Sequence, residues 1–354
     1  MLYRIMRPLM FRFDAERVHT FSLAALSLGH RLHLDMLYTL PVNTRPVQVM
    51  GLTFANAVGL AAGLDKNGAH IDALGALGFG FVEVGTVTPR PQPGNPKPRL
   101  FRLPRSRALI NRFGFNNRGV DFLVENVKRA KYRGIIGINI GKNFDTPNHL
   151  AVEDYANCLR KVYAHASYIT INISSPNTKD LRVLQQRNEL DSLLRTLKAE
   201  QLALARAHGK RVPLVVKISP DLLTAELNSI ADILLAHEIE GVIATNTTTT
   251  REGVEGQRYA QQAGGLSGAP LLHRSNAVVQ HLAQRLRGRI PIIGVGGILT
   301  GADAREKLAA GASLVQMYTG LIYRGPRLIQ EACAVLANKT LPELPHVNWR
   351  TERS

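Results

Sequence analysis

The sequence predicts an α/β fold, a (β/α)8 TIM barrel with an N-terminal two-helix extension. Three features support this prediction: short buried-strand runs recur, helical stretches separate them, and polar or glycine residues follow almost every run. Runs rich in Val, Ile and small residues have the length and composition of buried parallel strands. They occupy residues 58–61, 81–85, 135–140, 168–173, 214–218, 241–244, 290–295 and 313–317. Eight strand-then-helix units are typical of a closed barrel.

The segments between these runs have helical periodicity. Residues 152–165, 189–208 and 224–237 carry apolar residues at i, i+3 and i+4, the spacing of a helix with one buried face. A doubly wound parallel sheet is the alternative architecture, because strand counts from one sequence are uncertain. The residues that follow the strands favour the barrel, since a barrel gathers its chemistry at the carboxyl ends of its strands.

Each predicted strand runs into residues that can bind a ligand. For one such end, a turn or a helix cap is the ordinary explanation, whereas eight ends together indicate a site at the barrel mouth. The glycines after the seventh and eighth strands stand where barrels commonly bind a phosphate, so we expect a phosphorylated cofactor. In chain order the ends carry Gly63, Asp65 and Lys66; Thr86; Asn139; Asn172 to Asn177; Lys217; Thr245 and Asn246; Gly296 and Gly297; and Tyr318, Thr319 and Gly320.

Length and composition are those of a globular protein with a large core. The chain has 354 residues, 45% of them hydrophobic and 20% charged, which excludes a disordered or collagen-like chain. Two domains of about 150 residues fit this length, and so does one barrel of about 250 residues with an extension. We expect a helical extension at 1–40, the barrel at 41–336 and a tail at 337–354.

The net charge of +17, from 44 Lys and Arg against 27 Asp and Glu, favours anionic partners. Nucleic acid, a phosphorylated small molecule and an anionic membrane surface all qualify. Because the basic residues are scattered and aromatics make up 6% of the chain, we expect no nucleic-acid partner.

Cys158 and Cys333 lie far apart without the CxxC spacing of a zinc or iron–sulfur site, so we expect no metal and two inert thiols in a reducing compartment. No run approaches the roughly 20 apolar residues of a membrane span. Arg4, Arg7 and Arg12 interrupt any signal-peptide core. These features predict a protein in the cytosol or on a membrane surface.

Two segments lie outside the strand-helix pattern. Residues 1–40 are both basic and apolar, with two apolar stripes at helical spacing. Such helices either cap the bottom of the barrel or form an interfacial anchor that dips into a bilayer and admits an apolar substrate. The other segment, 88–112, is a long proline-rich linker, and long loops on the active face of a barrel are usually functional.

Eight motifs together resemble the dihydroorotate dehydrogenases, specifically the membrane-associated, quinone-dependent class 2 branch. The resemblance extends along almost the whole chain. The motifs are AAGLDKNG at 61–68, FGFVEVGTVTPRPQPGNPKPRLFRL at 79–103, INRFGFNN at 110–117, INISSPNT at 171–178, KISPD at 217–221, ATNTT at 244–248, GGLSG at 264–268 and IGVGGI at 293–298.

The resemblance implies oxidation of (S)-dihydroorotate to orotate in de novo pyrimidine (UMP) biosynthesis, with FMN bound across the barrel mouth. The residue types fit this cofactor, because glycine N–H groups can bind a phosphate and a lysine can stabilise an anionic reduced flavin. The implied flavin contacts are Ala62, Gly63, Thr86, Asn139, Asn172, Lys217, Thr245, Gly268, Gly296, Gly297, Tyr318, Thr319 and Gly320.

The resemblance also implies a substrate site rich in amides, which suits a cyclic amide that carries a carboxylate. Its catalytic base is Ser175, at the position where soluble class 1 enzymes carry cysteine. Serine is a weak base and needs a proton relay, for which Thr178 with a water is implied; the alternative reading is an ordinary Ser-Ser-Pro turn. The implied substrate contacts are Lys66, Asn111, Arg112, Phe113, Gly114, Phe115, Asn172, Asn177, Asn246 and Thr247.

The chain lacks a GxGxxG turn after a strand and the cysteines of an iron–sulfur relay, so a membrane quinone is the expected electron acceptor. By resemblance, a tunnel between the N-terminal helices leads to it, with His19, Arg102 and Tyr318 near the quinone head. We expect a monomer, bound peripherally to the cytoplasmic face of the inner membrane. A tRNA dihydrouridine synthase is an alternative, although its catalytic loop would carry a cysteine. A non-catalytic phosphate-binding barrel is another.

Overall fold

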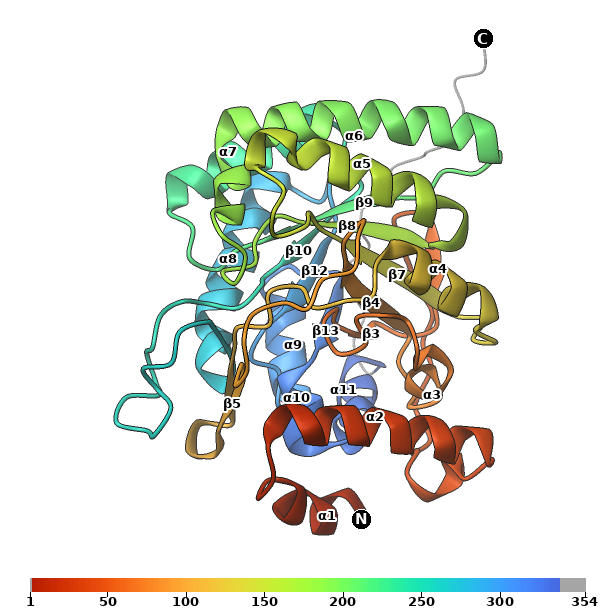
Figure 1. Cartoon of the computed structure of the whole chain (residues 1–354), viewed down its shortest axis with the longest axis vertical. Helices are drawn as coiled ribbons and strands as arrows, with labels where there is room; N and C mark the ends of the chain where they lie inside the picture. The colour runs from red at the N-terminus through yellow and green to blue at the C-terminus, as the bar shows by residue number, and fades with distance from the viewer. Residues whose placement is uncertain (1, 338–354) are drawn as a thin grey trace.

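The computed structural model describes residues 2–337, in which eight parallel strands close into a barrel (Figure 1). The strand order around the barrel follows the chain, and the last strand pairs with the first. The predicted (β/α)8 barrel is confirmed, and each predicted strand overlaps an observed one. These strands are β3 (Val58–Leu60), β4 (Phe81–Val87), β7 (Ile135–Ile140), β8 (Tyr168–Asn172), β9 (Leu214–Ile218), β10 (Gly241–Ala244), β12 (Ile292–Val295) and β13 (Leu314–Met317).

A helix follows each barrel strand and covers its outer face (Figure 1). In α6, Leu190, Leu193, Leu194 and Leu197 are buried at i, i+3, i+4 and i+7, and the helix ends at Gly209, whose φ of +63° favours glycine. The helices are α3 (Ile71–Gly75), α4 (Val120–Arg129), α5 (Ala151–Val162), α6 (Arg187–His208), α7 (Thr224–Ala236), α8 (Leu272–Leu286), α9 (Gly301–Ala309), α10 (Thr319–Arg324) and α11 (Arg327–Ala337). Residues 338–354 of the predicted tail lie outside the described residues.

Large aromatic side chains inside the barrel face glycines on the neighbouring strand. Gly59 pairs with Phe81 and Gly137 pairs with Tyr168 in the strand register. A Cβ on Gly59 would lie 2.3 Å from the Phe81 ring, and a Cβ on Gly137 would lie 2.2 Å from Tyr168 Cζ. Only glycine leaves room for these rings in a close-packed interior.

A short hairpin, β1 (Val47–Val49) and β2 (Leu52–Phe54), closes the amino-terminal end of the barrel. Phe54 is fully buried and its ring meets Phe81 edge-on, with centroids 5.1 Å apart. Met50, in the turn of the hairpin, lies against Gly241 at the start of β10. This closure leaves the carboxyl ends of the strands as the open end of the barrel.

A three-stranded antiparallel sheet lies at that open end. It consists of β5 (Leu100–Leu103), β6 (Ala108–Asn111) and β11 (Gly265–Gly268). The segment 88–112, expected to be a linker, therefore contains two strands. Each strand is only four residues long: β5 carries Arg102 and is followed by Pro104, and β6 has three apolar residues before Asn111, so both are shorter than most of the apolar runs that mark the barrel strands.

Two helices precede the barrel, α1 (Leu2–Met10) and α2 (Ala15–Arg31), drawn red in Figure 1. Asp14 caps α2, because its side chain accepts the N–H of Arg17 at 2.9 Å. The pair lies beside α3, α10 and β5, whereas the hairpin β1–β2 closes the bottom of the barrel. The alternative of a bottom cap is therefore wrong for these helices.

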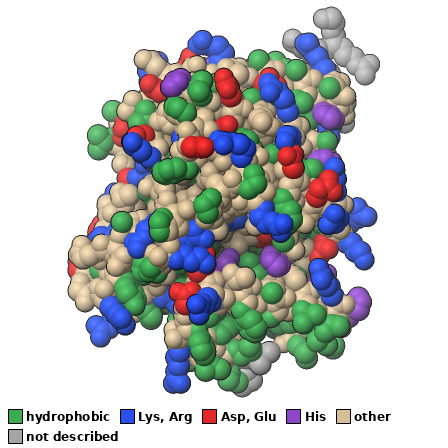
Figure 2. All heavy atoms as spheres, viewed as in Figure 1, with side chains coloured by type: hydrophobic (Ala, Val, Ile, Leu, Met, Phe, Trp, Pro, Cys, Tyr) green, Lys and Arg blue, Asp and Glu red, His purple; other side chains and the backbone are tan. Residues whose placement is uncertain are grey.

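The α1–α2 pair exposes many apolar side chains, and Figure 2 shows them gathered at the lower end of the molecule among Arg side chains. Phe21 is 66% exposed, an unusual value for a large apolar side chain in a globular protein. The others are Ile5, Met6, Leu9, Phe13, Leu28 and Leu32. No helix of residues 2–337 is long and apolar enough to cross a membrane.

Candidate active site

A cavity lies at the mouth of the barrel, between the carboxyl ends of the strands and the sheet β5–β6–β11. Most of the predicted site residues line it, and they come from the ends of seven barrel strands as well as from this sheet. They are Ala62, Gly63, Lys66, Thr86, Asn111, Phe113, Gly114, Phe115, Asn172, Ser175, Asn177, Lys217, Thr245, Asn246, Thr247, Gly268, Gly296, Gly297, Tyr318, Thr319 and Gly320.

Five predicted site residues lie outside the lining of this cavity. Asn139 and Thr178 are buried in the surrounding structure. The Arg112 side chain donates to Gln262 Oε1 at 2.8 Å and stacks 4.7 Å from the centre of the Phe101 ring. His19 lies on α2, and Arg102 lies on β5 and contacts the segment between α1 and α2.

Several lining residues are absent from the sequence-based set. Most are apolar and read as core residues, so nothing in the sequence marks them. Ser267 stands beside Gly268 in the GGLSG motif, which was a usable signal, and its hydroxyl lies 2.8 Å from that of Thr319. The lining residues that the sequence did not predict are Ala61, Leu100, Leu109, Ser267, Leu271, Val295, Ile298, Gln316 and Met317.

A buried polar network inside the barrel supports the floor of the cavity. Glu83 on β4 is fully buried, and its carboxylate accepts hydrogen bonds from Tyr168 at 2.8 Å, Gln316 at 2.6 Å and Asn139 at 2.8 Å. A buried carboxylate is tolerated when donors satisfy it in this way. The three donors come from three other strands, so the network fixes β4 against β7, β8 and β13.

The network continues from Asn139 to the cavity. Thr86 Oγ1 donates to Asn139 Oδ1 at 2.6 Å, and Asn172 Nδ2 donates to Thr86 Oγ1 at 2.8 Å. Asn246 Nδ2 then donates to Asn172 Oδ1 at 3.3 Å and to Ser174 Oγ at 3.0 Å. Each amide is thereby held in one orientation, which presets the donors and acceptors that face a ligand.

A second pair of amides, Asn111 and Asn177, also lines the cavity. Asn177 Nδ2 donates to Asn111 Oδ1 at 3.2 Å. Asn177 Oδ1 is buried and has no hydrogen-bond partner within residues 2–337. A buried acceptor without a partner is costly, so this atom is available to a ligand N–H.

Two lysines bring positive charge to the cavity. Lys66 Nζ donates to Gly63 O at 2.7 Å and lies 4.0 Å from the centre of the Phe113 ring. Burial, followed by the charge of Arg99, lowers the Lys66 pKa to about 8. Lys217 at the end of β9 is 5% exposed; burial lowers its pKa, and the charge of Glu83 opposes the shift. Both ammonium groups are suited to bind anionic ligand groups.

Ser175 lies in the loop after β8 and lines the cavity, while 6% of its surface is exposed. Its Oγ accepts the N–H of Asn177 at 3.2 Å. Thr178 Oγ1, three residues further along the same loop, is buried without a partner in the described part of the chain. The hydroxyl of Thr178 is therefore free to bind a water or a proton-transfer partner.

Glycines form one wall of the cavity. Gly296 and Gly297 have φ values of +116° and +82°, which other residues rarely adopt. A Cβ on Gly297 would lie 2.3 Å from Leu272 Cα at the start of α8, and one on Gly320 would lie 2.1 Å from Ile298 O. This close packing requires glycine and leaves bare backbone facing the cavity, as a phosphate-binding wall needs.

The predicted quinone residues divide between the cavity and the N-terminal helices. Tyr318 lines the cavity. Burial, together with Lys66 and His70, lowers the His19 pKa to about 4, so its ring is neutral at neutral pH. Arg102 donates to Phe13 O at 2.7 Å and lies 4.6 Å from the centre of the Phe11 ring. Arg102 thus anchors the α1–α2 connection to β5.

The described residues provide neither a reactive thiol at the cavity nor a metal site. Cys158 and Cys333 are free thiols buried in α5 and α11, away from the cavity lining. Burial raises the pKa of both thiols, which makes them inert. Among residues 2–337, no group of three His, Cys, Asp or Glu side chains is arranged to hold a metal ion.

Comparison with known proteins places the chain in a family. The model of the dihydroorotate dehydrogenase family matches residues 45–339, which is most of the chain. The chain belongs to this family. A dihydroorotate dehydrogenase (quinone) of Aromatoleum aromaticum is 63% identical over 331 residues, which cover 94% of each chain. One of Methylobacillus flagellatus is 60% identical over 336 residues, 95% of this chain and 100% of the relative.

A solved dihydroorotate dehydrogenase shares the fold. The crystal structure of Eimeria tenella DHODH in complex with ferulenol is 40% identical, with a TM-score of 0.83, and covers 92% of this chain and 91% of that chain. Dihydroorotate dehydrogenases are flavin-dependent oxidoreductases. The glycine wall, the two lysines and the oriented amides of the cavity are the groups that a flavin and an anionic cyclic amide require.

Proposed function

We propose that this chain oxidises (S)-dihydroorotate to orotate and transfers the electrons through FMN to a membrane quinone. The observation that carries the proposal is the convergence of Ser175, four asparagines and Lys66 on one cavity at the barrel mouth. The four amides are Asn111, Asn172, Asn177 and Asn246. Relatives about 60% identical along nearly the whole chain carry the name dihydroorotate dehydrogenase (quinone).

FMN fits the chemistry of the cavity. The bare backbone at Gly296, Gly297 and Gly320 suits a phosphate, and Lys217 suits the flavin edge that becomes anionic on reduction. Thr86 and Thr245 add two further polar side chains to the lining of the cavity. When bound, the flavin supplies the acceptor for a hydride from C6 of the substrate.

The remaining steps belong to side chains of the chain itself. Lys66 binds the substrate carboxylate, and the amides hold the ring through paired donors and acceptors. Ser175 takes the proton from C5 as the hydride leaves C6, so that the C5–C6 bond becomes a double bond. Because serine is a weak base, its own proton must pass onward, and the unpartnered hydroxyl of Thr178 supports a relay through a water.

The N-terminal helices support a quinone site and a peripheral attachment to an anionic membrane surface. Their exposed apolar side chains lie among arginines, the combination of an interfacial anchor. We place the quinone head near His19, Arg102 and Tyr318, the membrane contact on the cytoplasmic face, and one chain in the functional unit. No observation favours tRNA as a substrate, because the loop after β8 presents serine and no cysteine lines the described cavity.

The first experiment follows the two half-reactions on the purified full-length protein. The flavin spectrum is recorded anaerobically, then dihydroorotate is added, then a ubiquinone analogue. We expect the flavin absorbance to bleach with dihydroorotate and to return with quinone. Bleaching without return would reject the quinone acceptor. A flavin whose absorbance does not change with dihydroorotate would reject the proposed substrate. A colourless protein would reject the proposed cofactor.

The membrane assignment has a separate test. The protein is mixed with vesicles of anionic or neutral phospholipid at low and high salt, and the bound fraction is measured by sedimentation. We expect stronger binding to anionic vesicles, weakened by salt, because the arginines around the apolar patch act through screened charge. Equal binding to both vesicle types, or none, would contradict the proposal.

A further inference from the structure

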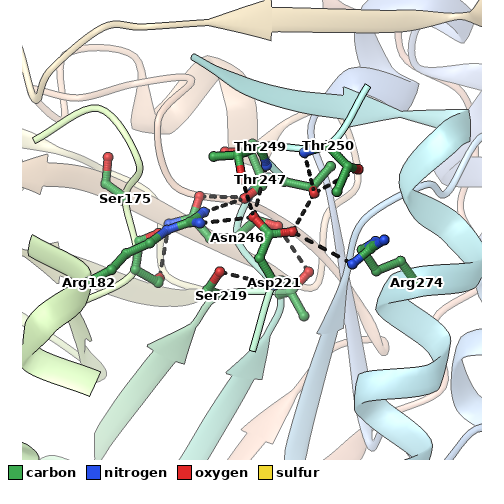
Figure 3. A network of polar contacts seen from close by, with 12 residues as sticks. Ser175, Arg182, Ser219, Asp221, Asn246, Thr247, Thr249, Thr250 and Arg274 are labelled. Atoms are coloured by element: carbon green, nitrogen blue, oxygen red, sulfur yellow. Dashed lines mark hydrogen bonds and ion pairs between the residues drawn. The ribbon is translucent and has the colours of Figure 1, made fainter. Parts of the chain in front are cut away.

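An ion pair joins the loop after β8, which carries the proposed catalytic Ser175, to the loop after β9. Arg182 lies in the 3-10 helix η5 (Leu181–Gln185), seven residues after Ser175, and Asp221 lies just after β9. Arg182 Nη1 donates to Asp221 Oδ2 at 2.9 Å. In Figure 3 the two side chains point toward each other across the gap between these loops.

The guanidinium of Arg182 also binds two backbone carbonyls. Its Nε donates to Ser174 O at 3.2 Å, and its Nη2 donates to Thr247 O at 3.0 Å. Ser174 precedes the proposed base Ser175, and Thr247 follows Asn246. One planar group therefore bonds to the loop after β8, the loop after β9 and the loop after β10 (Figure 3). Arginine is suited to this role because its donors are fixed in a rigid fork.

Asp221 holds the third loop through its own acceptors. It accepts the N–H of Thr249 at 2.8 Å and the Thr249 hydroxyl at 3.1 Å, and it also accepts the Thr248 hydroxyl. The carboxylate side chain is 15% exposed and that of Arg182 is 25% exposed. Burial alone would raise the Asp221 pKa, but hydrogen bonds from Thr248, Thr249 and Arg182 lower it, so the carboxylate stays charged.

We propose that Arg182 and Asp221 are positioning residues that set Ser175 relative to Asn246 and Thr247. The inference rests on the proposed function and adds residues that do not line the cavity. A proton transfer needs its base within hydrogen-bond reach of the substrate, and a displacement of about 1 Å can cost about 10²-fold in rate. Loss of the pair therefore slows proton removal without emptying the flavin site.

The test compares Arg182→Lys and Asp221→Asn with the matched control Arg274→Lys. Arg274 is a second arginine near the same carboxylate, 4.0 Å from Asp221 Oδ1, and its other ion-pair partner is Glu252 at 3.7 Å. Holoprotein is mixed anaerobically with dihydroorotate, and the rate of flavin bleaching is recorded by stopped flow. Orotate affinity is titrated on the oxidised protein through the flavin spectrum.

We expect Arg182→Lys and Asp221→Asn to slow flavin reduction about 10- to 100-fold. Lysine keeps the charge but cannot reach three acceptors, and asparagine loses the ion pair. Orotate affinity should stay within about threefold and the flavin should remain bound. Arg274→Lys should reduce its flavin within about twofold of the parent rate. A loss of orotate affinity that matches the loss of rate would contradict a positioning role.

A double variant separates positioning from a general structural effect. If Arg182 acts through Ser175, then Ser175→Ala with Arg182→Lys should be no more than about threefold slower than Ser175→Ala alone, because the base is already absent. Fully additive losses would overturn the proposal. Arg182→Ala adds an independent readout, since ethylguanidinium in solution should restore part of its flavin-reduction rate. No restoration by ethylguanidinium would reject the role of the guanidinium fork.

The outcomes for the two proposals are distinct. A parent protein that fails to bleach with dihydroorotate would reject the proposed function. A parent protein that bleaches normally, together with Arg182→Lys and Asp221→Asn variants that bleach at the parent rate, would reject only the positioning role.

Discussion

Glu16 on α2 and Arg99 just before β5 form a bidentate ion pair that fastens the N-terminal helices to the barrel mouth. Arg99 Nη2 lies 2.8 Å from Glu16 Oε1, and Arg99 Nε lies 3.1 Å from Glu16 Oε2. The same guanidinium donates to Asn95 O at 2.9 Å, and Asn95 Nδ2 donates to Asn177 O at 3.1 Å. A continuous set of contacts thus runs from α2 to the substrate loop.

We predict that Glu16→Ala lowers the free energy of unfolding by about 3 kcal/mol, because it leaves the buried Arg99 without its carboxylate. Urea unfolding at neutral pH measures the loss. The control is Glu125→Ala, which breaks the exposed pair with Lys128 and should leave the unfolding free energy almost unchanged, because solvent screens that pair. Equal losses of unfolding free energy in the two variants would show that the Glu16–Arg99 pair stabilises the fold no more than an exposed ion pair does.

The Glu16 pair also predicts a dependence on acid. Burial opposes ionisation of Glu16, but Arg99 and Lys97 lower its pKa below the usual value. A carboxylate with a lowered pKa contributes stability above its unfolded pKa, and this contribution disappears as the pH falls through the folded pKa. The stability margin of the parent over Glu16→Gln should therefore shrink below about pH 4. A margin that stays constant down to pH 3 would refute this.

Deletion of residues 1–40 is expected to abolish quinone reduction, because the deletion removes both helices of the proposed quinone site. The assay is flavin reoxidation by a ubiquinone analogue after reduction with dihydroorotate. Glu16→Gln is the control for loss of the ion pair alone and should still reduce quinone. The tunnel hypothesis is wrong if the truncated protein folds, binds flavin and reduces quinone normally.

Ser175→Ala should slow flavin reduction by dihydroorotate about 10²- to 10⁴-fold, the usual contribution of a positioned general base, while the flavin stays bound. Anaerobic stopped flow gives the rate. Ser106→Ala serves as the control, since that hydroxyl bonds to Gly253 O on the surface. A Ser175→Ala protein that bleaches at the parent rate would leave the Ser-Ser-Pro turn as the better interpretation.

Orotate affinity should fall above about pH 8. Burial and Arg99 lower the Lys66 pKa to about 8, and a neutral lysine no longer attracts the ligand carboxylate. The dissociation constant should be constant from about pH 6.5 to 7.5 and then rise toward tenfold per pH unit. Titration of the flavin spectrum with orotate up to pH 9 measures it. The Lys66→Met variant should bind orotate more weakly, and its dissociation constant should not rise with pH. A parent dissociation constant that stays constant up to pH 9 would exclude Lys66 as the group that binds the carboxylate.

Lys307 on α9 predicts a stability that rises with pH. It is fully buried, donates to the Ser275 hydroxyl, and has its pKa lowered by burial to about 7. Between pH 7 and the ordinary lysine pKa of about 10.4, the unfolded chain binds more protons, so alkali favours the folded state. The unfolding free energy of the parent relative to Lys307→Met should rise by roughly 1.4 kcal/mol per pH unit from pH 7.5 to 9. Urea unfolding measures this difference at each pH. A difference between the parent and Lys307→Met that stays constant from pH 7.5 to 9 would contradict the prediction.

The sequence alone predicted the barrel and most of the residues that line its mouth. The strand runs were readable because parallel strands covered on both faces are almost continuously apolar, as 135–140 and 214–218 illustrate. Gly296 and Lys217 were identifiable because their residue types interrupt that pattern at the point where a strand ends.

The sequence could not predict the contacts that depend on distant segments. Glu83 and Tyr168 read as ordinary strand residues, and their hydrogen bond requires β4 and β8 to meet across the barrel. Arg182 and Asp221 read as solvated loop charges, although the fold brings them within 2.9 Å. The strands β5 and β6 were missed for a related reason, since a four-residue strand gains its stability from its neighbours.

The pairing of Gly137 with Tyr168 restricts how this barrel can change through descent. A larger residue at 137 would need a smaller one at 168, but the Tyr168 hydroxyl also binds Glu83, so a smaller residue would leave that carboxylate short of a donor. A substitution at either position alone therefore destabilises the fold. A compensating substitution at both positions also destabilises it, because the Glu83 carboxylate loses a hydrogen-bond donor. We therefore expect both residues to persist in descendants whose surfaces have diverged far from this one.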